Sequence, residues 1–377
     1  MKKILTLILT VAFAAIVSAE SISRVQIGDL YYNLDTESQT AEVTYKSYEY
    51  KSLSSVKGYF YNYEWDIATA HIPETVTYDE VPYKVTRIGE SAFSDCANLQ
   101  TAVIDSGVTV IDEYAFMGCK NLTSVSMPNS IVKIGKCAFS ECESMTSVSI
   151  PASVTTIGSD AFYNKSGNLN AVYITDLSAW CKMDFEEYDW ATVQANPLIY
   201  AHNLYLNGEL VTDLVIPDDI TEVKEKIFAG CHSFTSVTIH DNVSKVAVGA
   251  FIRCINIDSI SIGKKVTEIE TAAFRACTNL KAVTCKASTP PLINDFTFAG
   301  INCSEIPLYV PTASVELYNS TNLWKDFNPI IGIDVPKDEE GVERLSAPSS
   351  STKIIRDGQL LIERNGKLYN VSGAEVK

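Results

Sequence analysis

Residues 115–162 read AFMGCKNLTSVSMPNSIVKIGKCAFSECESMTSVSIPASVTTIGSDAF, and Ala-Phe opens, divides and closes this stretch at intervals of 23 residues. The same pair, or an equivalent of it, starts at residues 92, 115, 138, 161, 227, 250, 273 and, more weakly, 297. A fixed period of roughly 20–50 residues is the signature of stacked repeats, because each unit is too small to bury its own apolar face. The 377-residue chain is therefore predicted to be a solenoid over most of its length.

Each unit has a regular internal pattern. Apolar residues follow the Cys of a unit at the third, sixth and eighth positions, as in Leu122, Val125 and Met127. This L-x-x-L-x-L pattern is typical of leucine-rich repeats, and its alternation predicts a strand with every second side chain in the core. The predicted fold is an α/β-type repeat solenoid of 23-residue leucine-rich repeats, with a β-rich N-terminal cap and a small β C-terminal tail. A structural Cys ladder is predicted at the position three residues after Phe, at Cys96, Cys119, Cys142, Cys231, Cys254 and Cys277.

The run MPNSIVKIGKCAFSECESMTSVSIPASVTTIGSDAF, from Met127, resembles the BspA-type leucine-rich repeats of surface proteins in Bacteroidetes and some protists. Residues 172–216 resemble the irregular unit often found inside such arrays, and the segment from Leu308 resembles their closing segment, so that the resemblance covers residues 25–333. Lys165 stands where other units have Cys, which predicts an interruption of the regular stack there. The resemblance implies adhesion, at the cell surface, to host matrix proteins, other bacteria or glycans.

The N-terminus predicts export. Lys2 and Lys3 precede an apolar run that is too short to span a membrane, and Val17-Ser18-Ala19 provides the small residues of a signal-peptidase site. We expect an exported protein, at the cell surface or secreted. The predicted division is a signal peptide at 1–19, a β-rich cap at 20–87, the solenoid at 88–333 with an irregular unit at 166–226 and a closing cap at 301–333, a linker at 334–352, and a small β tail at 353–377. The end of that tail resembles tails recognised for secretion or surface attachment.

The charge balance excludes one class of partner. Lys and Arg number 30 against 46 Asp and Glu, which gives a formal net charge of −16. Nucleic-acid binders need basic patches that neutralise phosphates, so DNA and RNA are not expected partners. No later segment is long and apolar enough to predict a membrane span.

The residues that usually carry chemistry do not form a recognisable motif. The four histidines, His71, His202, His232 and His240, are scattered, and no Cys-x-x-Cys pair occurs, so we expect no metal site. The sequence has no nucleophile elbow and no phosphate-binding loop, so we expect no catalytic residues and no cofactor. The ladder Cys are predicted to be buried free thiols. Cys137, at a variable site of the unit, is expected at the surface, and the sequence does not assign Cys181 and Cys303.

Two regions are predicted to present a binding surface. Small hydroxyl residues alternate with the core positions of the strands, a pattern that also fits strands that are simply soluble. In the irregular unit, residues 176–185 are predicted to form a helix with Asp176 as its N-cap and with Trp180 and Phe185 in the core, while Trp190 is the aromatic residue expected to be exposed. The candidate surface comprises Ser124, Ser126, Ser147, Ser149, Ser236, Thr238, Ser259, Ser261, Tyr188 and Trp190.

These features predict a non-enzymatic, exported leucine-rich-repeat protein with an extended surface for protein–protein contacts or for host or bacterial adhesion. Its expected partners are host matrix or bacterial surface proteins, or glycans. One alternative is a carbohydrate-binding accessory protein of a glycan-uptake system, whose sugar binding would be lost on Trp190→Ala. Another is an enzyme that works through the irregular unit, which would require polar groups converging in one cleft.

Overall fold

The computed structural model describes residues 21–46, 48–51, 60–63, 66–186 and 195–335, and four strands between 352 and 376. The chain forms two compact units, residues 1–334 and residues 335–377. The predicted signal peptide, Tyr188 and Trp190 lie outside the described residues.

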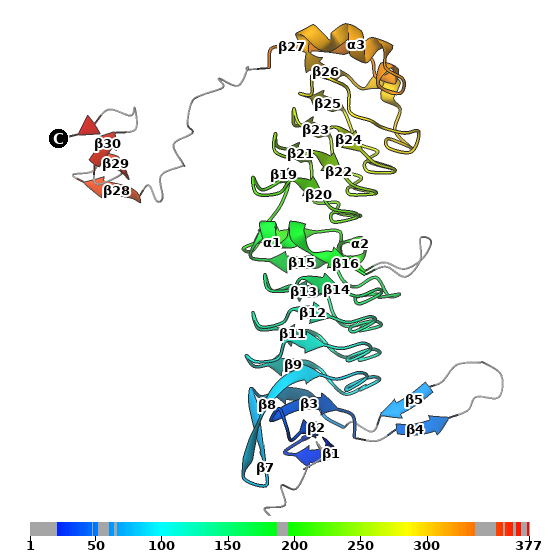
Figure 1. The fold of residues 1–377 in the computed structure, drawn as a ribbon, viewed down its shortest axis with the longest axis vertical. Helices are drawn as coiled ribbons and strands as arrows, with labels where there is room; N and C mark the ends of the chain where they lie inside the picture. Colours follow the sequence, from blue (N-terminus) through cyan, green and yellow to red (C-terminus); the bar gives the residue numbers. More distant parts are fainter. Residues whose placement is uncertain are drawn as a thin grey trace, which may run out of the picture. The chain divides into compact units, whose positions relative to one another are not determined.

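The first unit is a stack of coils, each of which contributes strands to two parallel ladders (Figure 1). The longer strands follow the L-x-x-L-x-L pattern and form what we call the first ladder. It consists of β6 (Thr69–Ile72), β9 (Thr101–Ile104), β11 (Ser124–Ser126), β13 (Ser147–Ser149), β15 (Ala171–Ile174), β17 (Leu204–Leu206), β18 (Glu209–Leu210), β19 (Asp213–Val215), β21 (Ser236–Ile239), β23 (Ser259–Ile262), β25 (Ala282–Cys285), β26 (Leu308–Pro311) and β27 (Ile330–Ile333).

The second ladder consists of the short strands that precede each Ala-Phe turn. Its members are β8 (Val81–Ile88), β10 (Val110–Ile111), β12 (Lys133–Ile134), β14 (Thr156–Ile157), β16 (Asp184–Phe185), β20 (Glu222–Val223), β22 (Lys245–Val246) and β24 (Glu268–Ile269). A glycine follows several of these strands because the coils approach closely there. A Cβ at Gly135 would lie 2.6 Å from the backbone carbon of Asp112, and one at Gly158 would lie 2.5 Å from the backbone nitrogen of Lys136.

The N-terminal strands extend the second ladder and cover its first coil. Strands β1 (Ser21–Ile27), β2 (Leu30–Asp35) and β3 (Thr40–Thr44) are antiparallel, and β3 then pairs with β8 in parallel. Strand β7 (Thr75–Tyr78) pairs with β8 as a hairpin, and β4 (Tyr48–Lys51) pairs with β5 (Phe60–Tyr63). Because an open solenoid end would expose apolar surface, such a cap stabilises the stack.

Stacked aromatic rings form the centre of the core. Phe93, Phe116, Phe139 and Phe162 stack with centroids 5.0–5.4 Å apart, and the second run of Phe228, Phe251, Phe274 and Phe298 stacks at 5.3–5.5 Å. The six ladder Cys are buried beside these rings, and none forms a disulfide. The repeat period thus places identical side chains one above another.

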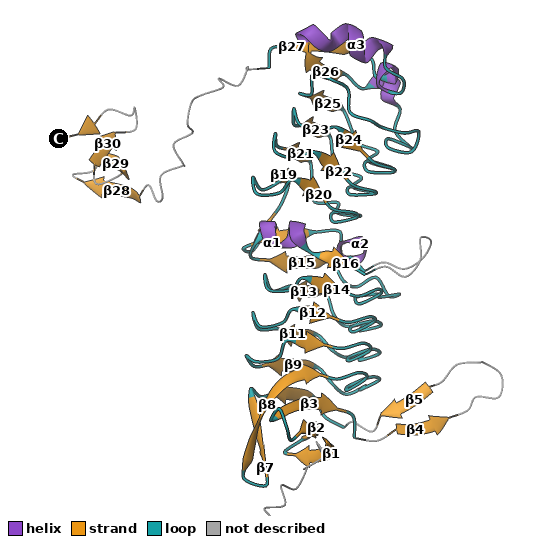
Figure 2. Cartoon of the chain, viewed as in Figure 1, coloured by secondary structure: helices purple, strands orange, loops and turns teal. Residues whose placement is uncertain are grey.

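The arms that return from one ladder to the other are turns rather than helices (Figure 2). Positive φ angles recur two residues before and two residues after the Phe, as at Tyr114 and Gly118 around Phe116. The backbone N–H of each such Phe donates to the carbonyl of the next coil, as from Phe116 to Ala138 at 2.8 Å. Cys137, expected at the surface, occupies one of the left-handed positions and is half-buried.

The irregular unit differs in part from its prediction. Helix α1 spans Leu177–Lys182, and the Asp176 carboxylate accepts from the Ala179 N–H at 3.0 Å, as expected of an N-cap. The helix ends before residue 185, because Asp184–Phe185 pairs with β14 and continues the second ladder. Trp180 is buried, and Phe185 is partly buried against it. A second short helix, α2, spans Leu198–Ala201.

The interruption predicted at Lys165 comes later in the chain. Strand pairing continues past it, from β13 to β15 and β17, and next breaks between β18 and β19 in the first ladder and between β16 and β20 in the second. An earlier break in the first ladder lies between β11 and β13. At the position before Lys165, the Asn164 side chain donates to the carbonyl of Cys142 at 3.3 Å and so links the two coils without a thiol. The irregular unit is therefore paired through strands with the coils before it, and it is joined to the coil after it by hydrogen bonds outside the strands, as from the His232 N–H to the carbonyl of His202 at 2.6 Å.

The C-terminal end of the first unit closes the core. It contains η1 (Cys303–Glu305), η2 (Thr312–Ser314), α3 (Val315–Ser320) and η3 (Trp324–Asp326). The Trp324 indole packs edge-on against Phe298 and donates to the carbonyl of Pro291 at 2.8 Å. The second unit is an antiparallel meander of β28 (Thr352–Arg356), β29 (Gln359–Arg364), β30 (Lys367–Asn370) and β31 (Glu375–Val376).

Candidate binding surface

The eight predicted Ser and Thr residues lie on one face of the first ladder. Ser236 pairs with Ser259, and Thr238 pairs with Ser261, so equivalent residues form rows across the strands. The residues between them, such as Val237 and Ile260, are buried. All eight are partly or fully exposed. The structure thus brings the Ser and Thr candidates together, whereas Tyr188 and Trp190 lie outside the described residues.

Two tyrosines continue a row of this face, and sequence reasoning did not place them there. Ser149 pairs with Tyr173, and Tyr173 pairs with Tyr205. The two rings stack with centroids 4.7 Å apart and an interplanar angle of 28°. Both side chains are partly exposed, because their neighbours on each strand point into the core. The signal was present in the alternation of residues 172–174 and 204–206, but the irregular spacing hid its register.

A hollow lies beside this tyrosine pair, and we call it the ladder hollow. Its volume is about 290 Å³. One rim is the turn between β17 and β18, where Asn207 and Gly208 have φ angles of 52° and 86°. Positive φ at both positions is what a two-residue Asn-Gly hairpin turn requires. The lining residues are Met127, Asn129, Ser149, Ile150, Pro151, Tyr173, Ile174, Thr175, Asn207 and Gly208, none of which is charged.

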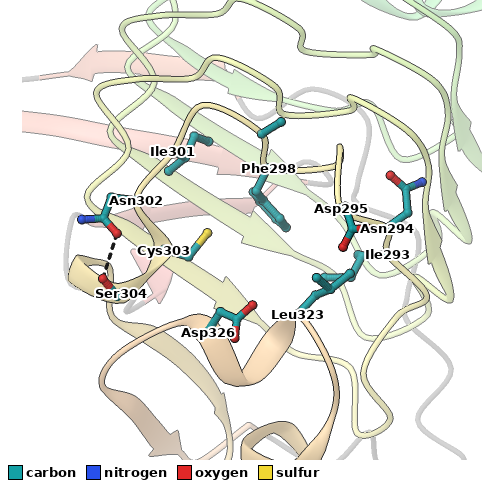
Figure 3. A pocket seen from close by; sticks show the side chains of 11 residues that line it. Ile293, Asn294, Asp295, Phe298, Ile301, Asn302, Cys303, Ser304, Leu323 and Asp326 are labelled. Carbon is teal, nitrogen blue, oxygen red and sulfur yellow. Dashed lines mark hydrogen bonds between the residues drawn. The ribbon is translucent and has the colours of Figure 1, made fainter.

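A larger hollow of about 520 Å³ lies at the C-terminal end of the stack (Figure 3). Phe298 lies between Cys303 and Asp326 on one side and Asp295 on the other. Burial raises the pKa of the Cys303 thiol to about 11, and the nearby Asp326 carboxylate adds to this effect. The thiol is therefore protonated at neutral pH, which is the wrong state for a nucleophile.

The four histidines have structural contacts. His202 and His232 stack with ring centroids 4.0 Å apart, and the His202 Nδ1 lies 3.0 Å from the carbonyl of Gly230. The Nε2 of His240 lies 2.7 Å from the carbonyl of Pro217. His71 lies on the exposed first ladder, 3.0 Å from the Asp105 carboxylate. Within the described part of the chain, no three His, Cys, Asp or Glu side chains gather as a metal site.

Comparison with protein families identifies the repeat. The family model described as BspA type leucine rich repeat region matches residues 59–186 and 201–320, with six copies. The chain belongs to the BspA-type leucine-rich-repeat family. The leucine-rich-repeat solenoid predicted from the 23-residue period is thereby confirmed, and so is the resemblance to BspA-type repeats.

Solved structures of bacterial leucine-rich-repeat proteins resemble this BspA-type chain. A leucine-rich repeat protein from Bacteroides ovatus is 21% identical, with 81% of this chain and 98% of that one covered and a TM-score of 0.30. A leucine rich cell surface protein from Faecalibacterium prausnitzii is 18% identical, with 79% and 91% covered and a TM-score of 0.31. One from Eubacterium ventriosum is 21% identical, with 78% and 80% covered and a TM-score of 0.39. Comparison with curated proteins gives no match.

The α-helices that the structure describes in this BspA-type chain have four to six residues. None in the described part of the structure is long and apolar enough to cross a membrane.

Proposed function

We propose that this BspA-type protein is an exported, non-enzymatic adhesion protein that binds a protein partner through the exposed face of its first ladder. The observation that carries the proposal is the set of small hydroxyl side chains on one face of β11, β13, β21 and β23, with Tyr173 and Tyr205 in the row of Ser149 and the 58%-exposed Val215 in the row of Thr238. Tyrosine and apolar contacts surrounded by small polar groups are typical of binding surfaces. The sequence pattern of residues 1–19, which predicts a signal peptide, supports export.

The geometry of the ladder suits a broad partner. Its rows repeat in parallel register from β19 to β27, with strands separated by about 4.8 Å. Stable protein interfaces bury about 800 Å² on each side, so a protein partner is expected to contact many strands of this face rather than a single pocket. The expected partners are host matrix proteins or surface proteins of other bacteria.

The test is a binding screen of residues 20–377 against matrix proteins and bacterial surface proteins at physiological salt. Thr238→Lys and Ser261→Lys place long charged side chains on the proposed face, and we expect each to weaken binding at least tenfold. Thr156→Lys, on the second ladder, is the matched control and leaves binding unchanged. The proposal would be overturned if all three substitutions weakened binding equally, or if none of the matrix proteins and bacterial surface proteins bound.

A further inference from the structure

The Tyr173 ring presents an open aromatic face to the ladder hollow. Tyr205 covers the ring from the following strand, with centroids 4.7 Å apart. On the preceding strand the paired residue is Ser149, whose side chain is too small to cover an aromatic ring. The ring face toward Ser149 therefore forms a wall of the hollow, which both residues line.

The floor of the ladder hollow is apolar and fixed. Ile150, Pro151 and Ile174 are buried residues of the strand ends and the turns that follow them. The hollow thus combines a rigid apolar base with an aromatic wall. Small-molecule sites have this composition, with a few polar groups that orient the ligand.

Four neutral polar side chains surround this base. Those of Asn129, Ser149, Thr175 and Asn207 have no hydrogen-bond partner among the residues that the structure describes. Other asparagines on the coils are used structurally. The side chains of Asn121, Asn168 and Asn256 each donate to a carbonyl of the preceding coil at 2.7–2.8 Å. Asn129 and Asn207 therefore remain available to a ligand that offers both donors and acceptors.

We propose that the ladder hollow binds one neutral hexopyranose residue, free or at the end of a glycan. The C–H face of the sugar ring lies on Tyr173, since an aromatic face attracts polarised C–H groups as it does other ring edges. The sugar hydroxyls replace water on Asn129, Ser149 and Asn207. A charged sugar is disfavoured because no cationic side chain lines the hollow and the chain carries a net charge of −16. This inference goes beyond the proposed function, since it requires no protein partner.

The experiment is ligand-observed NMR and calorimetry of residues 20–377 with the methyl glycosides of glucose, galactose, mannose and N-acetylglucosamine. Glucuronic acid and N-acetylneuraminic acid serve as charged probes. For so small a ligand we expect a Kd of about 1 mM for at least one neutral glycoside. Tyr173→Ala weakens binding by about tenfold or more, and Asn129→Ala by about threefold to tenfold.

Two further variants distinguish sugar binding in the ladder hollow from sugar binding elsewhere on the chain. Tyr309→Ala alters the same face at a distant strand, so binding and melting temperature are expected to stay unchanged. Asn129→Ala removes an exposed side chain, so its effect is readable even if Tyr173→Ala fails to fold. Three outcomes would each overturn the proposal. The first is that no neutral glycoside binds at about 10 mM, and the second is that the charged sugars bind more tightly than the neutral ones. The third is that sugar binding is lost on Trp190→Ala but kept in Tyr173→Ala and Asn129→Ala.

Discussion

At the scale of single residues, each of the ladder residues Cys119, Cys142, Cys254 and Cys277 has two roles. It fills a small apolar space beside the Phe stack, and its thiol donates to the carbonyl of the Phe one coil earlier. The Sγ to O distance is 3.0 Å from Cys119 to Phe93, 3.1 Å from Cys254 to Phe228 and 3.3 Å from Cys277 to Phe251. A small side chain that is both apolar and a weak donor meets this combination of needs, which gives a physical reason for the Phe-x-x-Cys spacing.

The ladder thiols are therefore predicted to resist alkylation. Burial raises the pKa of Cys96 to about 11 and that of Cys277 to about 12, so that thiolate is scarce at pH 8. Because the thiolate is the reactive species, iodoacetamide at pH 8 leaves the six ladder Cys unmodified in the native protein. Peptide mass spectrometry checks this, with urea-unfolded protein as the control in which all ten Cys react. Rapid native labelling of Cys254 would contradict the packing described above.

At the scale of the structural element, the return arm depends on its left-handed residues. Two positive-φ positions flank six of the eight stacked Phe residues, and different coils use different residues there. The position two residues after Phe is Gly118 and Gly230 in two coils but Arg253 in another, with a φ of 60°. The left-handed conformation costs a residue with a Cβ about 1–2 kcal/mol. Glycine avoids this cost, but it loses more conformational entropy on folding, which cancels part of the gain.

Arg253→Gly is accordingly predicted to stabilise the protein by about 0.5–1 kcal/mol. The Arg253 side chain is exposed, so little packing is lost. Chemical denaturation measures the change. Arg253→Ala is the matched control, because it removes the same side chain but keeps the Cβ, and it brings no comparable gain. A loss of stability in the glycine variant would show that the Arg253 side chain matters more than the backbone conformation.

The stacked histidines His202 and His232 predict a pH dependence at the junction of the irregular unit with the coil that follows it. Burial lowers the pKa of His232 below 6.5, and the neighbouring His202 lowers it further. The folded state favours the neutral His232 ring. Its contribution to the free energy of unfolding is therefore fully present above the unfolded-state pKa of about 6.5, and it is lost as the pH falls through the lowered folded-state pKa. The melting temperature of His232→Gln should fall less steeply between pH 7 and 5 than that of the wild type. His71→Gln, a change at an exposed histidine, should keep the wild-type slope, and three identical slopes would refute the assignment.

At the scale of the whole molecule, side chains replace strand pairing where the ladder breaks. The indole of Trp180 donates to the carbonyl of Ile227 at 3.1 Å, and the side-chain amide of Asn196 donates to the same oxygen at 3.0 Å. Lys182 pairs with Asp219, and Lys224 pairs with Asp184. The buried contacts carry most of this connection, because exposed ion pairs contribute only about 0–1 kcal/mol each.

Removal of the C-terminal unit is predicted to leave the solenoid intact. Residues 1–334 and 335–377 are separate compact units, and the solenoid has its own closing cap at Trp324. Residues 20–334 should therefore melt within about 2 °C of residues 20–377, by the usual relation between stability and melting temperature. The shorter protein should also keep the protein and sugar binding proposed above. A drop of about 10 °C would show that residues 335–377 stabilise the first unit.

The sequence by itself determined the repeat, the strand pattern and the inward Phe and Cys positions, because identical units in a stack have identical environments. The same reasoning set the Ser and Thr residues between core positions on one face, since side chains alternate along a strand. It did not place Tyr173 beside Ser149, or set Asn129 and Asn207 around one hollow. Those neighbours come from the irregular unit, where the spacing departs from 23 residues and only the hydrogen-bonded register decides which side chains meet.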